Sequence, residues 1–124
     1  MSTVLIVEDN EKNMKLARDV LQAKGYQTVE ALTGEEGVKL AKERKPDLVL
    51  MDIQLPGING IEAFRRIRGD AATRSIPVVA LTASVTPTDR SAISAAGFDA
   101  FISKPISLKE FLDTVKRLVE GKKG

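Results

Sequence analysis

Four short apolar runs in the sequence are each followed closely by residues whose side chains can do chemistry: Glu8 and Asp9, Asp52, Thr82, and Lys104. Carboxylates a few ångströms apart repel each other by roughly 1–4 kcal/mol per pair, so a group of three either holds a proton or binds a cation. Oxygen ligands without histidine or cysteine select a hard ion such as Mg²⁺. A lysine neutralises phosphoryl oxygens and a threonine donates a hydrogen bond. These residue types favour phosphoryl transfer to an aspartate, with Asp52 as nucleophile.

Each of these residues has a simpler interpretation when taken alone. Asp52 is compatible with a turn cap. Glu8 and Asp9 are compatible with exposed acids that favour the dipole of a following helix. Thr82 fits an ordinary strand position, and Lys104 fits a solvated turn. Because all of them follow different predicted strands, a shared site explains the pattern better than four separate coincidences.

The elements that must bring these residues together are also visible in the sequence. Apolar runs alternate with helical patterns five times, and the expected strands lie at 4–7, 28–29, 48–51, 78–81 and 100–102. Apolar residues recur at helical spacing between them. The clearest cases are Met14, Ala17 and Leu21; Ile61, Phe64 and Ile67; and Leu108, Phe111, Leu112, Val115 and Val119.

Helix boundaries are marked by capping residues. A capping oxygen precedes a glutamate by three positions at Thr33–Glu36, Asn59–Glu62 and Ser107–Glu110, which is the pattern of a helix start. Pro87 fits a first helical position, where its missing N–H costs nothing. Gly25 and Gly97 stand where helices are expected to stop.

Strand–helix alternation with short links implies right-handed crossovers and a parallel sheet covered on both faces. We therefore predict an α/β fold, a flavodoxin-like (βα)5 doubly wound parallel sheet with strand order 2-1-3-4-5, in which residues 1–124 form a single domain. Ligands of such sheets bind at the carboxyl ends of the strands. The five polar residues are expected to meet in that crevice.

Composition excludes several other functions. The 124 residues contain no histidine and no cysteine, which excludes Ser-His triads, imidazole or thiolate metal sites and disulfides. No apolar stretch approaches the ~20 residues that cross a bilayer, and the N-terminus lacks a secretory signal, so we expect no membrane insertion and a cytoplasmic location. The net charge of +2 is small, and four of the 19 basic residues cluster at the C-terminus, where they favour a helix dipole: Lys116, Arg117, Lys122 and Lys123. Direct DNA binding is not expected.

Four motifs resemble those of a known family. They are Val-Glu-Asp-Asn at 7–10, Met-Asp-Ile-Gln-Leu-Pro at 51–56, Leu-Thr-Ala at 81–83 and Ser-Lys-Pro at 103–105. This set closely resembles the receiver domain of two-component response regulators, in particular the stand-alone, CheY-like members. The resemblance spans about residues 3 to 120. It implies a phosphoprotein of a two-component or phosphorelay system.

The resemblance assigns a role to each site residue. Asp52 is the implied phosphoacceptor, phosphorylated from a histidine kinase phosphohistidine. Asp9, Asp52 and the backbone carbonyl of Gln54 are the implied ligands of Mg²⁺ (or Mn²⁺), and Glu8 acts largely through a metal-bound water. Lys104 is implied to pair with a phosphoryl oxygen.

The resemblance also implies a conformational switch. Thr82 shifts to hydrogen-bond the phosphoryl group, and Phe101 is the aromatic residue that rotates inward behind it. Gln54 and Ser84, two residues beyond Asp52 and Thr82, occupy positions that tune the lifetime of the phosphoryl group in the family.

Two residues differ from those common in the family, and one peptide bond is expected to match it. Glu8 stands where many members have aspartate, and its longer side chain still reaches a metal-bound water. Phe101 stands where tyrosine is common, so a partner that reads a tyrosine hydroxyl loses that contact. The bond between Lys104 and Pro105 is expected to be cis, as in family members.

The expected partners are a sensor histidine kinase or a histidine phosphotransfer protein. A downstream protein would bind the face formed by the helix after Thr82, the strand through Phe101 and the last helix. Small residues on this face suit close approach but equally suit simple helix formation: Ala92, Ala95, Ala96 and Ala100. We expect a signalling phosphoacceptor without an output domain rather than an enzyme.

Two other functions fit parts of this pattern. A Mg²⁺-dependent phosphatase or phosphotransferase also uses a strand-end aspartate, but it usually needs a general acid two residues later, where this chain has Gln54. A flavodoxin-like binder needs a phosphate-cradling loop after the first strand, where this chain has acids instead.

Overall fold

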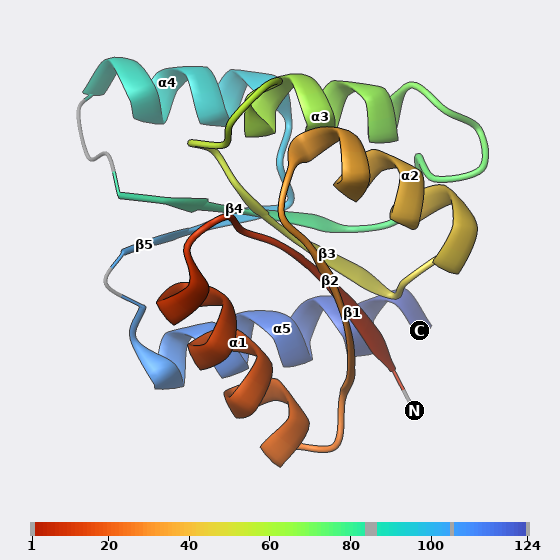
Figure 1. Cartoon of the computed structure of the whole chain (residues 1–124), viewed down its shortest axis with the longest axis vertical. Coiled ribbons are helices and arrows are strands. Elements are labelled where there is room, and N and C mark those ends of the chain that lie inside the picture. The colour runs from red at the N-terminus through yellow and green to blue at the C-terminus, as the bar shows by residue number, and fades with distance from the viewer. Residues whose placement is uncertain (1, 84–86, 105, 124) are drawn as a thin grey trace.

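The computed structural model describes residues 2–83, 87–104 and 106–123, which form alternating strands and helices (Figure 1). The strands are β1 (Thr3–Val7), β2 (Gln27–Ala31), β3 (Leu48–Asp52), β4 (Val78–Thr82) and β5 (Ala100–Ser103). The helices are α1 (Glu11–Ala23), α2 (Gly34–Arg44), α3 (Gly60–Arg68), α4 (Pro87–Ala96) and α5 (Leu108–Lys123).

All strand pairs are parallel, and the sheet order is β2-β1-β3-β4-β5, which confirms the predicted fold and strand order. At their carboxyl ends β3, β4 and β5 extend one residue further than the apolar runs indicated, because Asp52, Thr82 and Ser103 are still paired in the sheet. The second strand was predicted too short, at 28–29, since all residues of Gln27–Ala31 pair with β1. Asp52 pairs with Leu81, and Thr82 pairs with Ser103. The chemical side chains of β3 and β4 are therefore held by strand hydrogen bonds rather than by loops.

Helices cover both faces of the sheet (Figure 1). On one face α1 and α5 enclose a core that includes Leu21, Phe111 and Val115; on the other, α2 and α3 enclose a core that includes Phe64 and Ile67. The strands β3 and β4 are buried along their whole length, as expected for strands packed on two sides. Because both strands are buried, Asp52 and Thr82 are held in fixed positions at the strand ends.

The predicted helix boundaries agree with the structure where capping is described. The Thr33 side chain accepts a hydrogen bond from the Glu36 N–H, and Asn59 accepts one from the Glu62 N–H. The turn at Gly25 (φ 90°) and the turn at Gly97 (φ 96°) use positive φ angles that favour glycine. Within the described ranges, none of the helices combines the length and hydropathy that a membrane span requires.

Candidate functional site

Asp52 lies at the carboxyl end of β3, with 3% of its surface exposed. Its Oδ1 accepts a hydrogen bond from the Gln54 N–H at 2.9 Å, and its Oδ2 accepts one from Lys104 Nζ at 2.8 Å. The backbone turn after Asp52 is closed by Gly60, whose N–H donates to Ile53 O at 3.0 Å. A side chain at Gly60 would collide with the Asp52 carbonyl, so this glycine allows α3 to start directly against the site.

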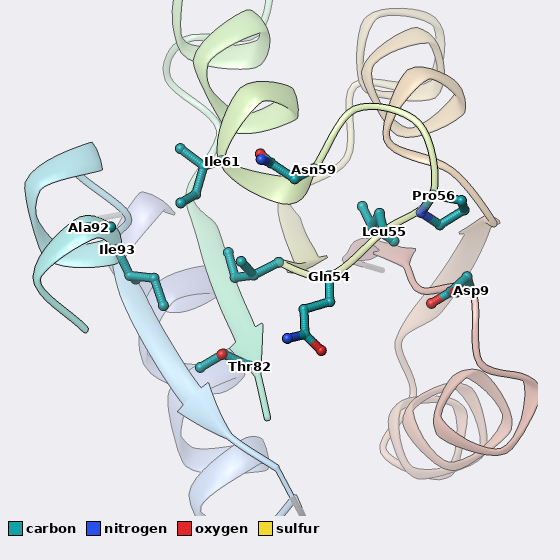
Figure 2. Close-up of a pocket in the computed structure, with 10 residues that line it drawn as sticks. Asp9, Gln54, Leu55, Pro56, Asn59, Ile61, Thr82, Ala92 and Ile93 are labelled. Carbon is teal, nitrogen blue, oxygen red and sulfur yellow. The ribbon is translucent and has the colours of Figure 1, made fainter. Parts of the chain in front are cut away.

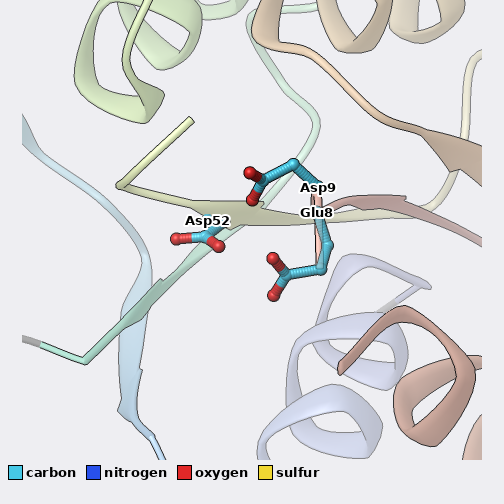
Figure 3. A group of neighbouring side chains, drawn as sticks. All are labelled: Glu8, Asp9 and Asp52. Atoms are coloured by element: carbon cyan, nitrogen blue, oxygen red, sulfur yellow. The ribbon is translucent and has the colours of Figure 1, made fainter. Parts of the chain in front are cut away.

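Glu8 and Asp9 follow β1 and reach the same edge of the sheet. Glu8 is 1% exposed, while Asp9 is exposed. Figure 3 shows the carboxylates of Glu8, Asp9 and Asp52 gathered from the ends of two neighbouring strands. One oxygen from each of the three lies within 4.8 Å of the others. The structure thus brings together the three acids that the sequence singled out.

Lys104 joins the acidic group from the end of β5. Its Nζ lies 2.7 Å from Glu8 Oε1 and 2.8 Å from Asp52 Oδ2, and its side chain is 15% exposed. Burial alone would lower the pKa of this amine, but the hydrogen bonds to Asp52 and Glu8 outweigh it and raise the pKa. Lys104 is therefore a charged group that neutralises two buried carboxylates.

Of the three acids, Glu8 has a carboxyl whose pKa is clearly raised by this arrangement. Burial raises the pKa of the Glu8 carboxyl from 4.5 to about 7, and contact with the Asp52 carboxyl adds to the rise. Hydrogen bonds from Lys104 and the Asn10 backbone act in the opposite direction but are weaker. Three acids and one lysine leave an excess of negative charge, which a hard cation would neutralise.

Thr82 and Phe101 occupy different surroundings. Thr82 ends β4 with 1% of its surface exposed, and its carbonyl accepts a hydrogen bond from the Lys104 N–H at 2.8 Å. Phe101, in the middle of β5, is 40% exposed. Phe101 therefore presents much of its side chain to solvent, whereas Thr82 lies at the buried edge of the site.

Two cavities adjoin the acidic group and share Asp9 and Gln54 in their walls. The cavity over the acids has a volume of about 410 Å³ and is lined by Glu8, Asp9, Asn10, Asn13, Asp52, Gln54, Ala83 and Lys104. The second has a volume of about 660 Å³ and extends between the loop after β3 and α4, with Gln54 and Thr82 at one end (Figure 2). The Asp52 carboxylate is therefore reached from solvent through the smaller cavity.

Two of the predicted features lie outside the described residues: Ser84 and the peptide bond to Pro105. Asn10 was included in a family motif without being given a role, and neither Asn13 nor Gly60 was singled out from the sequence. Asn10 caps α1, since its Oδ1 accepts hydrogen bonds from the N–H groups of Lys12 and Asn13. An asparagine directly before a helical pattern is the signal that would have revealed the cap.

The fold, together with the three acids at the carboxyl edge of its sheet, is that of a receiver domain. Comparison with known proteins gives the same family. The sequence profile of the response regulator receiver domain matches residues 4–116, so the chain belongs to that family of two-component signalling proteins. It is 48% identical over 114 residues to the polar-differentiation response regulator DivK of Brucella anthropi, covering 92% of this chain and 93% of DivK. DivK of Brucella abortus S19 matches with the same identity and coverage. The chain is thus a DivK-like receiver, and the resemblance read from the sequence is confirmed.

Solved structures are also similar. A putative response regulator from Chloroflexus aurantiacus superposes with a TM-score of 0.91 at 30% identity, covering 96% of this chain and 98% of that one. The receiver domain of sensor histidine kinase PA1611 from Pseudomonas aeruginosa, with magnesium coordinated in its active-site cleft, superposes with a TM-score of 0.90 at 31% identity. That match covers 96% of this chain and 98% of the other.

Proposed function

We propose that this receiver accepts a phosphoryl group on Asp52 from the phosphohistidine of a sensor histidine kinase or a histidine phosphotransfer protein. The observation that supports the proposal best is the position of the Asp52 carboxylate. It is held by the Gln54 N–H and Lys104 Nζ, next to two further acids, at the mouth of an open cavity. A carboxylate held in place beside a cavity that can admit a phosphodonor is suited to attack on phosphorus.

The chemistry of the donor set fits Mg²⁺ (or Mn²⁺). Three carboxylates contribute oxygen atoms within 4.8 Å of each other, and the chain has neither histidine nor cysteine. Asp9 and Asp52 would hold the ion directly with the Gln54 carbonyl, and Glu8 would hold a water bound to it. Mg²⁺ supplies neutralisation of charge on the phosphoryl oxygens when it is bound.

Asp52 and Lys104 are the side chains proposed to take part in the transfer itself. An Asp52 oxygen attacks phosphorus while the bond from phosphorus to the donor nitrogen breaks. Lys104 Nζ, 2.8 Å from Asp52 Oδ2, turns from the carboxylates to a phosphoryl oxygen as negative charge builds there. The hydrogen bonds to Asp52 and Glu8 raise the pKa of the Lys104 amine, so the amine is charged when the phosphodonor enters, and the phosphoryl oxygens then take the place of the carboxylates as its anionic partner.

Thr82 and Phe101 are proposed to change the conformation of the protein surface when Asp52 is phosphorylated. The phosphoryl group adds about −1.5 to −2 charges, and a hydrogen bond to it from Thr82 is worth roughly 1.5–3 kcal/mol. Moving a two-state equilibrium from 1:99 to 99:1 requires about 5.5 kcal/mol. Thr82 alone is therefore insufficient, and we expect the isolated phosphorylated protein to switch only partly until a partner binds the active state.

The competing enzymatic function is less well supported. A phosphatase of this kind usually needs a general acid two residues after the nucleophile, and this position is Gln54, which has a neutral carboxamide. We therefore propose a signalling phosphoacceptor that assists its own phosphorylation and dephosphorylation, with residues 1–124 acting as one receiver domain in the cytoplasm with its kinase. A downstream protein partner would bind the surface formed by α4, β5 and α5, where the exposed Phe101 lies.

One experiment tests the proposal. The protein is incubated with Mg²⁺ and acetyl phosphate, or with beryllofluoride, and its mass and the environment of Phe101 are measured. An adduct that disappears in Asp52→Asn is the expected result. An adduct independent of Asp52, or none at all, refutes the phosphoacceptor role, and turnover of small phosphate esters favours an enzyme instead.

A further inference from the structure

The cavity over the acids contains an amide that the proposed phosphorylation does not use. Asn13 is the third residue of α1, half-buried, and lines the same cavity as Asp52 and Lys104. Two other neutral amides reach this cavity, those of Asn10 and Gln54. The Asn10 oxygen caps α1, and Gln54 is exposed on the loop after β3.

The Asn13 carboxamide has no hydrogen-bond partner in the described part of the chain. Only its backbone N–H is used, as a donor to the cap at Asn10. The helix start therefore does not depend on this side chain, and asparagine is a poorer helix former than alanine. A half-buried amide with unused hydrogen-bonding groups, beside a reactive carboxylate, is suited to binding a polar group that enters the cavity.

We propose that Asn13 is a positioning residue that binds the imidazole ring of the phosphodonor, an inference that rests on the function proposed above. In the transfer, the bond between phosphorus and the donor's Nε2 breaks and its electron pair stays on Nε2, while the new bond forms to an Asp52 oxygen. The ring leaves as neutral imidazole when Nδ1 carries a proton. Asn13 Oδ1 accepts a hydrogen bond from that Nδ1–H, which favours the protonated donor and aims the ring at Asp52.

Two small phosphodonors distinguish binding of the imidazole ring by Asn13 from a general effect of Asn13 on the site. N-phosphoimidazole carries the ring nitrogen that Asn13 would bind, whereas acetyl phosphate does not. Rates of Asp52 phosphorylation are measured with both donors at saturating Mg²⁺ for the wild type, for Asn13→Ala, and for Lys15→Ala as a control on the exposed surface of α1. Alanine is a better helix former than asparagine, so the Asn13 variant is expected to fold.

The rate ratio between N-phosphoimidazole and acetyl phosphate is expected to fall about tenfold in Asn13→Ala, the effect of one lost hydrogen bond, and to stay at the wild-type value in Lys15→Ala. An unchanged ratio in Asn13→Ala overturns the inference, as does an equal loss with both donors, because that marks a structural or metal-binding role. Failure of the wild type to react with either donor would instead refute the phosphoacceptor function itself.

Discussion

The most direct consequence of the site's electrostatics concerns Glu8. Its carboxyl is 1% exposed, and its pKa is raised from 4.5 to about 7 by burial and by the Asp52 carboxyl. A group whose pKa is higher in the folded protein contributes stability below its unfolded pKa. That contribution is lost as the pH rises through the folded pKa. The metal-free protein is therefore expected to lose stability between about pH 4.5 and pH 7, as Glu8 becomes charged.

The magnitude follows from the size of the shift. Each pKa unit corresponds to about 1.4 kcal/mol, so a rise from 4.5 to about 7 corresponds to ~3 kcal/mol over the full range. Between pH 5 and pH 8, linkage predicts a loss of ~2–3 kcal/mol in the free energy of unfolding. Glu8→Gln keeps the size and a hydrogen-bond acceptor for Lys104 but has no proton to lose, so this pH-dependent loss should be absent.

The assay is urea unfolding followed by far-ultraviolet circular dichroism, at several pH values and with a chelator present. The wild type is compared with Glu8→Gln and with Glu43→Gln, an exposed acid on α2 that should follow the wild type. Added Mg²⁺ should reduce the wild-type loss, because the ion favours the charged carboxylate. Parallel pH profiles for the wild type and Glu8→Gln would refute the assignment of the raised pKa to Glu8.

Two further predictions test the geometry of the site. Lys104→Met removes a cation that contacts both Glu8 and Asp52. The variant should bind Mg²⁺ more tightly by calorimetry, while the metal-free protein loses ~3–5 kcal/mol of stability. Unchanged affinity would contradict the competition between lysine and metal. Gly60→Ala forces a methyl group against the Asp52 carbonyl and should destabilise the protein by ~2 kcal/mol or more. Gly69→Ala, whose added carbon meets only the Arg65 carbonyl at 3.1 Å, should cost measurably less in the same urea titrations, and equal losses would argue against a close approach at Gly60.

Most of the fold was predictable because its signals are local. Continuous apolar runs identified buried parallel strands, and the capping pairs at Thr33 and Asn59 marked helix starts that the structure contains. Strand ends were less predictable: Asp52 and Thr82 are polar, yet both remain paired in the sheet. Polarity indicates where burial should end, but the neighbouring strands decide how far the hydrogen-bonded ladder continues.

The candidate site was only partly predictable. The acids, the threonine and the lysine have distinctive chemistry, and their placement after strands indicated a common edge. Asn13 and Gly60 carry no such signal, because an asparagine on a helix and a glycine at a helix start are ordinary locally. The role proposed for Asn13 depends on the cavity that it lines, and the need for glycine at position 60 depends on the nearby Asp52 carbonyl.

The sequence by itself determined the strand–helix alternation, the types of residue at the strand ends and the family they resemble, since these depend on local pattern and chemistry. Tertiary structure alone decided how closely the groups approach. Lys104 and Glu8 are 96 positions apart, yet Nζ and Oε1 are separated by 2.7 Å. The raised pKa of the Glu8 carboxyl also belongs to the folded chain, because burial and the neighbouring charges exist only after β1, β3 and β5 have packed into one sheet.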